Sequence, residues 1–89
     1  MDMKISVKNT ANNNIAKFDV DFKNKNLKII DLPEDYMFDE IFEDLDFHHF
    51  NRWLNNRTGG YRDIDNIIDN IRTMHGRSPV DPLELYIED

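Results

Sequence analysis

The chain contains no cysteine and only three glycines, three prolines and one tryptophan among its 89 residues. Without cysteine, neither a disulfide framework nor a thiolate metal site can form, and the usual zinc fingers are excluded. Ser6 and Ser78 are the only serines, and neither lies within a Gly-x-Ser-x-Gly turn. The sequence therefore predicts no nucleophilic triad and no catalytic residues.

Long apolar runs are also missing. No stretch of 18 apolar residues occurs, and the first eight residues mix apolar with charged and polar side chains. We therefore expect neither a secretory signal nor a membrane span, but a cytoplasmic protein with no membrane partner. A chain of this length has enough apolar material for one packed core, which predicts a single domain over residues 1–89.

Charge is abundant but unevenly distributed, with 18 acidic and 11 basic side chains and a net charge of -7. Residues 1–30 carry six Lys against three Asp, whereas residues 31–50 carry eight acidic residues and no Lys or Arg. Residues 51–77 then hold five Arg against three Asp, and residues 78–89 hold four acidic residues. This balance opposes direct binding to nucleic acid and favours a basic protein surface as partner.

Two hydrophobic periods divide the chain. Apolar and polar residues alternate over residues 4–8 and 16–22, which predicts two strands joined by the Asn-rich turn at residues 9–14. Residues 27–32 form a third predicted strand, which Pro33 ends because proline cannot donate to a strand ladder.

Helical spacing begins after Pro33. A first helix is predicted from Glu34 and Asp35 in its first turn to Leu45, with a break near residue 47 and then a shorter second helix through Phe50, Trp53 and Leu54. Gly59-Gly60 precedes a third helix, marked by Ile64, Ile67, Ile68 and Ile71 and ended at Gly76, and residues 83–88 alternate as a last strand. We therefore predict one α+β domain: a small antiparallel sheet of three N-terminal strands and one C-terminal strand, with about three helices packed on one face.

Without cysteine, a metal site would need histidines together with carboxylates. His48 and His49 are adjacent and would point about 100° apart on a helix, so they cannot easily share one ion. Asp44, His48 and His75 form one conceivable set of ligands, although partly exposed imidazoles near a helix break fit the same pattern. Asp63-Ile64-Asp65 begins like a calcium loop but lacks its third acidic position, glycine and final glutamate. We predict no metal and no cofactor.

The arginines admit two interpretations. Together with Trp53 and Tyr61 they could form a stacking surface for nucleic acid, and Gly59-Gly60 could suggest a phosphate cradle. The acidic segment upstream opposes a phosphate backbone, and neither a P-loop nor a dinucleotide fingerprint surrounds the glycines. We therefore expect a helix-to-helix turn at the glycines, a core position for Trp53, and partners within the protein for the arginines: Arg52, Arg57, Arg62, Arg72 and Arg77.

The acidic segment is the feature that stands out. On one continuous helix, Asp35, Asp39, Glu43 and Asp46 would share a face, with Glu40 and Asp44 extending the charge around the side. Neighbouring carboxylates would then be spaced like the phosphates of a nucleic-acid strand, at a cost to the helix on the order of 1 kcal/mol. Either the segment is displayed outward as a substitute polyanion, or it is a solvated face that pairs loosely with the Lys-rich strands.

The small size, the acidity, the richness in Asn, Lys and Ile and the lack of a catalytic motif make the chain resemble small phage-encoded inhibitors of bacterial defence nucleases, the anti-CRISPR and anti-restriction proteins. The resemblance covers size and charge, and no motif. It implies a non-catalytic inhibitor whose acidic helix occupies the Lys/Arg-lined groove that a defence nuclease uses for DNA or guide RNA. The predicted partner-binding residues are Asp35, Tyr36, Asp39, Glu40, Glu43, Asp44 and Asp46, with Tyr36 as an exposed aromatic anchor.

Other functions fit the same sequence. A toxin-neutralising or regulatory interaction module would use the acidity against a basic enzyme that does not bind nucleic acid. A small metal-dependent hydrolase would use the histidines. The N-terminal hairpin is an alternative docking site, because an exposed strand edge can pair with a partner.

Overall fold

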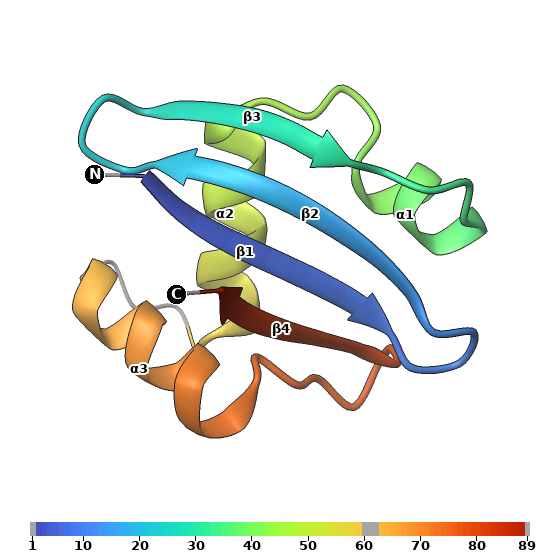
Figure 1. The fold of residues 1–89 in the computed structure, drawn as a ribbon. Helices are drawn as coiled ribbons and strands as arrows, with labels where there is room; N and C mark the ends of the chain where they lie inside the picture. Colours follow the sequence, from blue (N-terminus) through green and yellow to red (C-terminus); the bar gives the residue numbers. More distant parts are fainter. Residues whose placement is uncertain (1, 60–62, 89) are drawn as a thin grey trace.

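The computed structural model describes residues 2–59 and 63–88, which form four strands and three helices (Figure 1). The strands are β1 (Asp2–Asn9), β2 (Asn14–Asp21), β3 (Asn26–Asp31) and β4 (Leu83–Glu88). The helices are α1 (Tyr36–Ile41), α2 (Phe47–Arg57) and α3 (Ile64–Met74), all between β3 and β4 in the chain. The predicted α+β fold and its order of elements are confirmed.

The sheet is antiparallel throughout, with the strand order β3-β2-β1-β4. Ile5 in the middle of β1 lies opposite Phe18 of β2 on one side and opposite Ile87 of β4 on the other. The hairpin β1–β2 is therefore the centre of the sheet, and the interpretation of this hairpin as a free docking edge is wrong. The edges are β3 and β4, because β4 returns from the far end of the chain to pair with β1.

The core lies between one face of the sheet and the helices. The inward residues of β2 alternate with exposed or half-buried ones, and α2 crosses this face of the sheet (Figure 1). The Phe18 ring lies 5.1 Å from Phe42 and 5.0 Å from Phe50, which joins β2 to the residues around α2. The buried apolar residues are Ile5, Val7, Ala16, Phe18, Val20, Phe38, Phe42, Phe50, Leu54, Ile67, Ile71, Leu83 and Leu85.

The first two helices differ from the prediction in length. Helix α1 ends at Ile41 rather than continuing to Leu45, and α2 is the longer of the two, with 11 residues. The backbone of Asp44 adopts a left-handed conformation (φ 53°), which a continuing helix does not allow. Asp46 then caps α2, since its carboxylate accepts a hydrogen bond from the backbone N–H of His49 at 2.8 Å.

Helix α3 contacts β4 and has clear signals at both ends. Asp63 caps its N-terminus by accepting from the Asp65 N–H, as the sequence indicated. The chain turns away at His75 and Gly76, both left-handed, and a Cβ placed at Gly76 would lie 3.1 Å from a Leu85 methyl carbon. Within residues 2–59 and 63–88, no helix is long and apolar enough to cross a membrane.

Candidate partner-binding surface

Asp35, the first of the predicted contact residues, faces inward and is only 6% exposed. Its carboxylate caps α1 by accepting from the backbone N–H groups of Met37 (2.9 Å) and Phe38 (3.2 Å). The same carboxylate also accepts from three side-chain amides in or beside the β1–β2 turn: Asn9 (3.2 Å), Asn12 (2.7 Å) and Asn14 (2.9 Å). Asp35 therefore fastens the start of α1 to the end of the central hairpin.

This arrangement explains the ionisation of Asp35. Burial alone would raise its pKa, but the hydrogen bonds from Asn12, Asn14 and the two helical N–H groups outweigh burial and lower the pKa to about 2. A buried carboxylate with all these donors around it is a structural group. The prediction that Asp35 contacts a partner is therefore wrong, because a long-range amide cluster draws it into the protein.

The next four acidic residues do face outward. Asp39 and Glu40 lie on α1, and Glu43 and Asp44 lie in the connection to α2; all four side chains are exposed. Among the described residues, none of the four forms a hydrogen bond or an ion pair through its carboxylate. They occupy a single helical turn and the bend that follows it, so the predicted continuous helical face from Asp35 to Asp46 does not form. We call Asp39, Glu40, Glu43 and Asp44 the acidic bend.

Asp46 follows the acidic bend in the chain, and its carboxylate already forms hydrogen bonds within the protein. In addition to capping α2, its Oδ1 atom lies 2.7 Å from Nδ1 of His49. Hydrogen bonds from the His49 backbone N–H and imidazole lower the pKa of Asp46 below its usual range. Its side chain is still 62% exposed, which leaves one carboxylate oxygen for a partner.

Tyr36 lies at the other end of the acidic bend, as the first residue of α1. It is 83% exposed, the most exposed of the aromatic residues in the described part of the chain. The ring therefore stands in solvent beside the carboxylates, as predicted from its place in the sequence. Its role as an anchor stays a prediction.

The histidines are dispersed. Nε2 of His48 lies 3.0 Å from an Arg52 nitrogen, which can only donate, while His49 contacts Asp46. His75 lies at the end of α3, with its ring 4.6 Å from that of Tyr86. In the part of the chain that the structure describes, no three His, Asp or Glu side chains come together as a metal site, so Asp44, His48 and His75 are not assembled.

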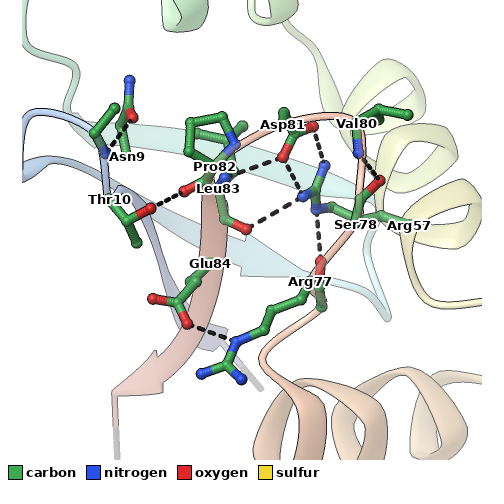
Figure 2. A network of polar contacts seen from close by, with 12 residues as sticks. Asn9, Thr10, Arg57, Arg77, Ser78, Val80, Asp81, Pro82, Leu83 and Glu84 are labelled. Carbon is green, nitrogen blue, oxygen red and sulfur yellow. Dashed lines mark hydrogen bonds and ion pairs between the residues drawn. The ribbon is translucent and has the colours of Figure 1, made fainter.

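Arg57 has partners inside the protein, as expected, and is nearly buried (Figure 2). Its guanidinium forms two parallel bonds to Asp81, at 2.6 and 2.8 Å, and donates to the carbonyls of Gly76 and Leu83. Burial would raise the pKa of Asp81, but the bonds from Arg57 and from the Leu83 N–H lower it. The pair ties the end of α2 to the loop before β4.

Other aromatic and arginine residues complete this picture. Trp53 packs on the core as predicted, 5.2 Å from Phe42, although it is half-buried, and the Arg57 guanidinium lies 5.0 Å from its ring. Arg77 pairs with Glu84 at 2.7 Å. Gly60, Tyr61 and Arg62 lie outside the described residues.

A shallow groove of about 360 Å³ lies beside β4, within the region drawn in Figure 2. Several of its polar groups are already bonded within the protein: Thr10 donates to the Pro82 carbonyl, Asp81 binds Arg57 and Glu84 binds Arg77. The groove is thus lined by a structural network. Sequence reasoning did not find the acidic partners of Arg57 and Arg77, although the run of acidic residues after residue 78 was the available signal. The lining residues are Thr10, Arg77, Ser78, Asp81, Pro82, Leu83 and Glu84.

The fold and the charged surfaces define a small α+β domain with an exposed acidic bend. No protein-family model matches the chain, and neither a curated protein nor a solved structure is significantly similar to it. Function must therefore be inferred from the residues themselves.

Proposed function

We propose that this chain is a non-catalytic acidic inhibitor that binds the basic nucleic-acid-binding groove of a bacterial defence nuclease and blocks the access of DNA or guide RNA. The acidic bend carries the proposal. Asp39, Glu40, Glu43 and Asp44 lie within six residues, are exposed, and have no internal cation among the described residues. A domain that pairs its buried charges so closely elsewhere leaves these four for solvent or for a partner.

The chemistry of the bend suits a groove lined by Lys and Arg. Carboxylates on an exposed bend can accept charge-assisted hydrogen bonds from guanidinium and ammonium groups, which occupy the places of phosphate contacts. The net charge of -7 adds a long-range attraction that steers the protein to a basic surface. Tyr36 at the edge of the bend supplies apolar area, which charge alone does not provide.

This mechanism predicts a strong dependence on salt. Exposed charges are screened over about 8–10 Å at physiological ionic strength, so binding should weaken steeply as salt rises. Duplex DNA should compete, because both ligands claim the same groove. An interaction module that binds through apolar contacts would show neither behaviour.

The test compares two variants with the same net charge. Asp39→Asn/Glu43→Gln removes two charges from the acidic bend, and Asp65→Asn/Asp69→Asn removes two exposed charges from α3, so both carry a net charge of -5, two less negative than the wild type at -7. Each immobilised protein is offered a bacterial lysate at low and high salt, and bound proteins are identified by mass. Purified captured nuclease is then tested for cleavage with and without each variant.

We expect the wild type and the α3 variant to retain a nucleic-acid-binding nuclease, to release it in high salt or excess duplex, and to inhibit its cleavage. The acidic-bend variant should lose these properties. Equal behaviour of the two variants would show that only net charge matters, and a complex insensitive to salt and DNA would contradict the proposal outright.

A further inference from the structure

The two edge strands of the sheet, β3 and β4, differ in how their outward backbone groups are hydrogen-bonded. On β4, the Leu85 N–H donates to the His75 carbonyl at 2.8 Å, and the Leu85 carbonyl lies 3.3 Å from Nδ1 of His75. The Leu83 N–H donates to Asp81, and the Leu83 carbonyl accepts from Arg57. The protein's own loops and side chains therefore satisfy the outward backbone groups of Leu83 and Leu85 on β4.

The outer edge of β3 has no such cover. Within residues 2–59 and 63–88, its backbone forms no hydrogen bond beyond those to β2. Ile29 and Ile30 are 44% and 46% exposed, and Asn26 and Lys28 are exposed beside them. An edge with free N–H and C=O groups and two exposed isoleucines is a surface on which another strand can pair.

The edge is also protected against indiscriminate pairing. Lys28 places a charge on it, and a register shift opposite Lys17 and Phe18 makes β3 irregular. Both features hinder an arbitrary strand. A strand that pairs here must therefore match the distribution of charge along β3.

The charges at the two ends of β3 are opposite in sign. Lys23 and Lys25 precede β3, whereas Asp31 and Glu34 stand at and after its end; all four are exposed and form no ion pair with another described residue. In an antiparallel pair of two β3 strands, the lysine end of one copy lies beside the acidic end of the other, twice by symmetry. Residues 23–34 carry three Lys and two acidic residues, so the large net charge is not concentrated there.

We propose that β3 pairs in antiparallel fashion with β3 of a second copy of this chain, so that the two four-stranded sheets form one continuous sheet across a two-fold axis. The pairing satisfies the open edge, covers Ile29 and Ile30, and brings opposite charges together at both ends of the strand. It does not depend on the function proposed above.

The first test is the mass of the protein in solution, measured by sedimentation equilibrium over a range of concentrations. The wild type should be a dimer, and Ile29→Lys/Ile30→Lys should be a folded monomer. Val80→Lys is the control for adding a lysine at an exposed apolar position, because Val80 is 85% exposed and far from β3 in sequence, and this variant should remain a dimer. A monomeric wild type, or a dimer that survives Ile29→Lys/Ile30→Lys, overturns the proposal.

A charge swap tests the antiparallel arrangement on exposed residues only. Lys23→Glu/Lys25→Glu makes both ends of β3 acidic, and Asp31→Lys/Glu34→Lys makes both ends basic. Each variant alone should dimerise about ten-fold more weakly or worse, with unchanged far-UV circular dichroism. An equimolar mixture should regain the wild-type affinity as a heterodimer, since the charges at both ends of the strand attract each other again and Lys28 is the same in both variants. Two weak variants that do not associate with each other would contradict the arrangement.

Discussion

The network around Arg57 and the acidic bend are both rich in charged side chains, but among the residues that the structure describes those side chains are paired in the first region and unpaired in the second. Arg57 is only 5% exposed on its side chain, and its bonds are used within the protein. The carboxylates from Asp39 to Asp44 are exposed and unpaired among the described residues. Charge in the first region holds elements together, whereas charge in the second region is free to act on something else.

The comparison also shows why position matters more than composition. Residues 51–77 are rich in arginine, as a nucleic-acid surface would be, but Arg57 and Arg77 are bound to Asp81 and Glu84. Asp81 lies 24 positions after Arg57, and Glu84 lies 7 positions after Arg77. The acidic bend has no such partners among the described residues.

The largest effect is expected from Arg57→Ala. Removing the guanidinium leaves the mostly buried Asp81 carboxylate without its cation and two backbone carbonyls without the Arg57 donor, which should lower the free energy of unfolding by about 3–5 kcal/mol. Urea denaturation measures the loss. Arg77→Ala, which breaks a pair whose arginine is 65% exposed, is the control and should cost much less. Similar losses for the two would mean that the Arg57 network is not structural.

Asp35→Ala should rank second, with a loss of about 2–4 kcal/mol in the free energy of unfolding, because it removes a helix cap and the acceptor of three asparagine amides, of which that of Asn9 is buried. Asp35→Asn should lose less, since asparagine can also cap a helix. Thermal or urea unfolding of both variants tests this order. An unchanged stability for Asp35→Ala would show that the amide cluster contributes nothing.

Acid should weaken the fold through the same carboxylate. The pKa of Asp35 is lowered to about 2 in the folded protein, against about 3.9 in the unfolded chain, so its contribution is present above pH 4 and is lost as pH falls towards 2. The expected loss is on the order of 2 kcal/mol. Comparing the wild type with Asp35→Asn from pH 5 to pH 2 should show a shallower slope for the variant. Parallel slopes would contradict the assignment.

The smallest effects are expected in the acidic bend. Asp39→Asn/Glu43→Gln should change the free energy of unfolding by less than about 0.5 kcal/mol per site, because neither side chain has a described partner. Asp44→Gly should stabilise by up to about 1 kcal/mol, since glycine accepts φ 53° without strain, whereas Asp44→Val should destabilise. Urea unfolding curves decide both. A large loss for Asp39→Asn/Glu43→Gln would place the bend with the structural charges.

Local patterns predicted the elements of this fold well. Strict alternation marked β2, and the spacing of Ile64, Ile67 and Ile71 marked α3, because each pattern reflects one buried face. The extent of α1 was wrong because Phe42 and Leu45 keep helical spacing although the backbone turns at Asp44. The spacing of apolar residues indicates which side chains are buried, and side chains beyond the end of α1 still pack against the core.

The candidate site was only partly accessible to such reasoning. Tyr36 and the residues from Asp39 to Asp44 are exposed where an acidic surface was predicted. Asp35 is different because its partners Asn12 and Asn14 lie more than twenty residues away in the sequence. No local sequence pattern shows that asparagines of the β1–β2 turn will bind the residue that caps α1. The same limit applied to the Arg57–Asp81 pair.

The pairing of β1 with β4 has a consequence for how the protein is made. Ser6 bonds to Glu88, a partner 82 positions later, and β1 lies at the centre of the sheet only once β4 is in place. During synthesis, β1 must therefore wait with one side open until residues 83–88 have left the ribosome. Pairing between such distant segments is slow to form. While β1 is unpaired on one side, the chain can mispair and can be bound by chaperones.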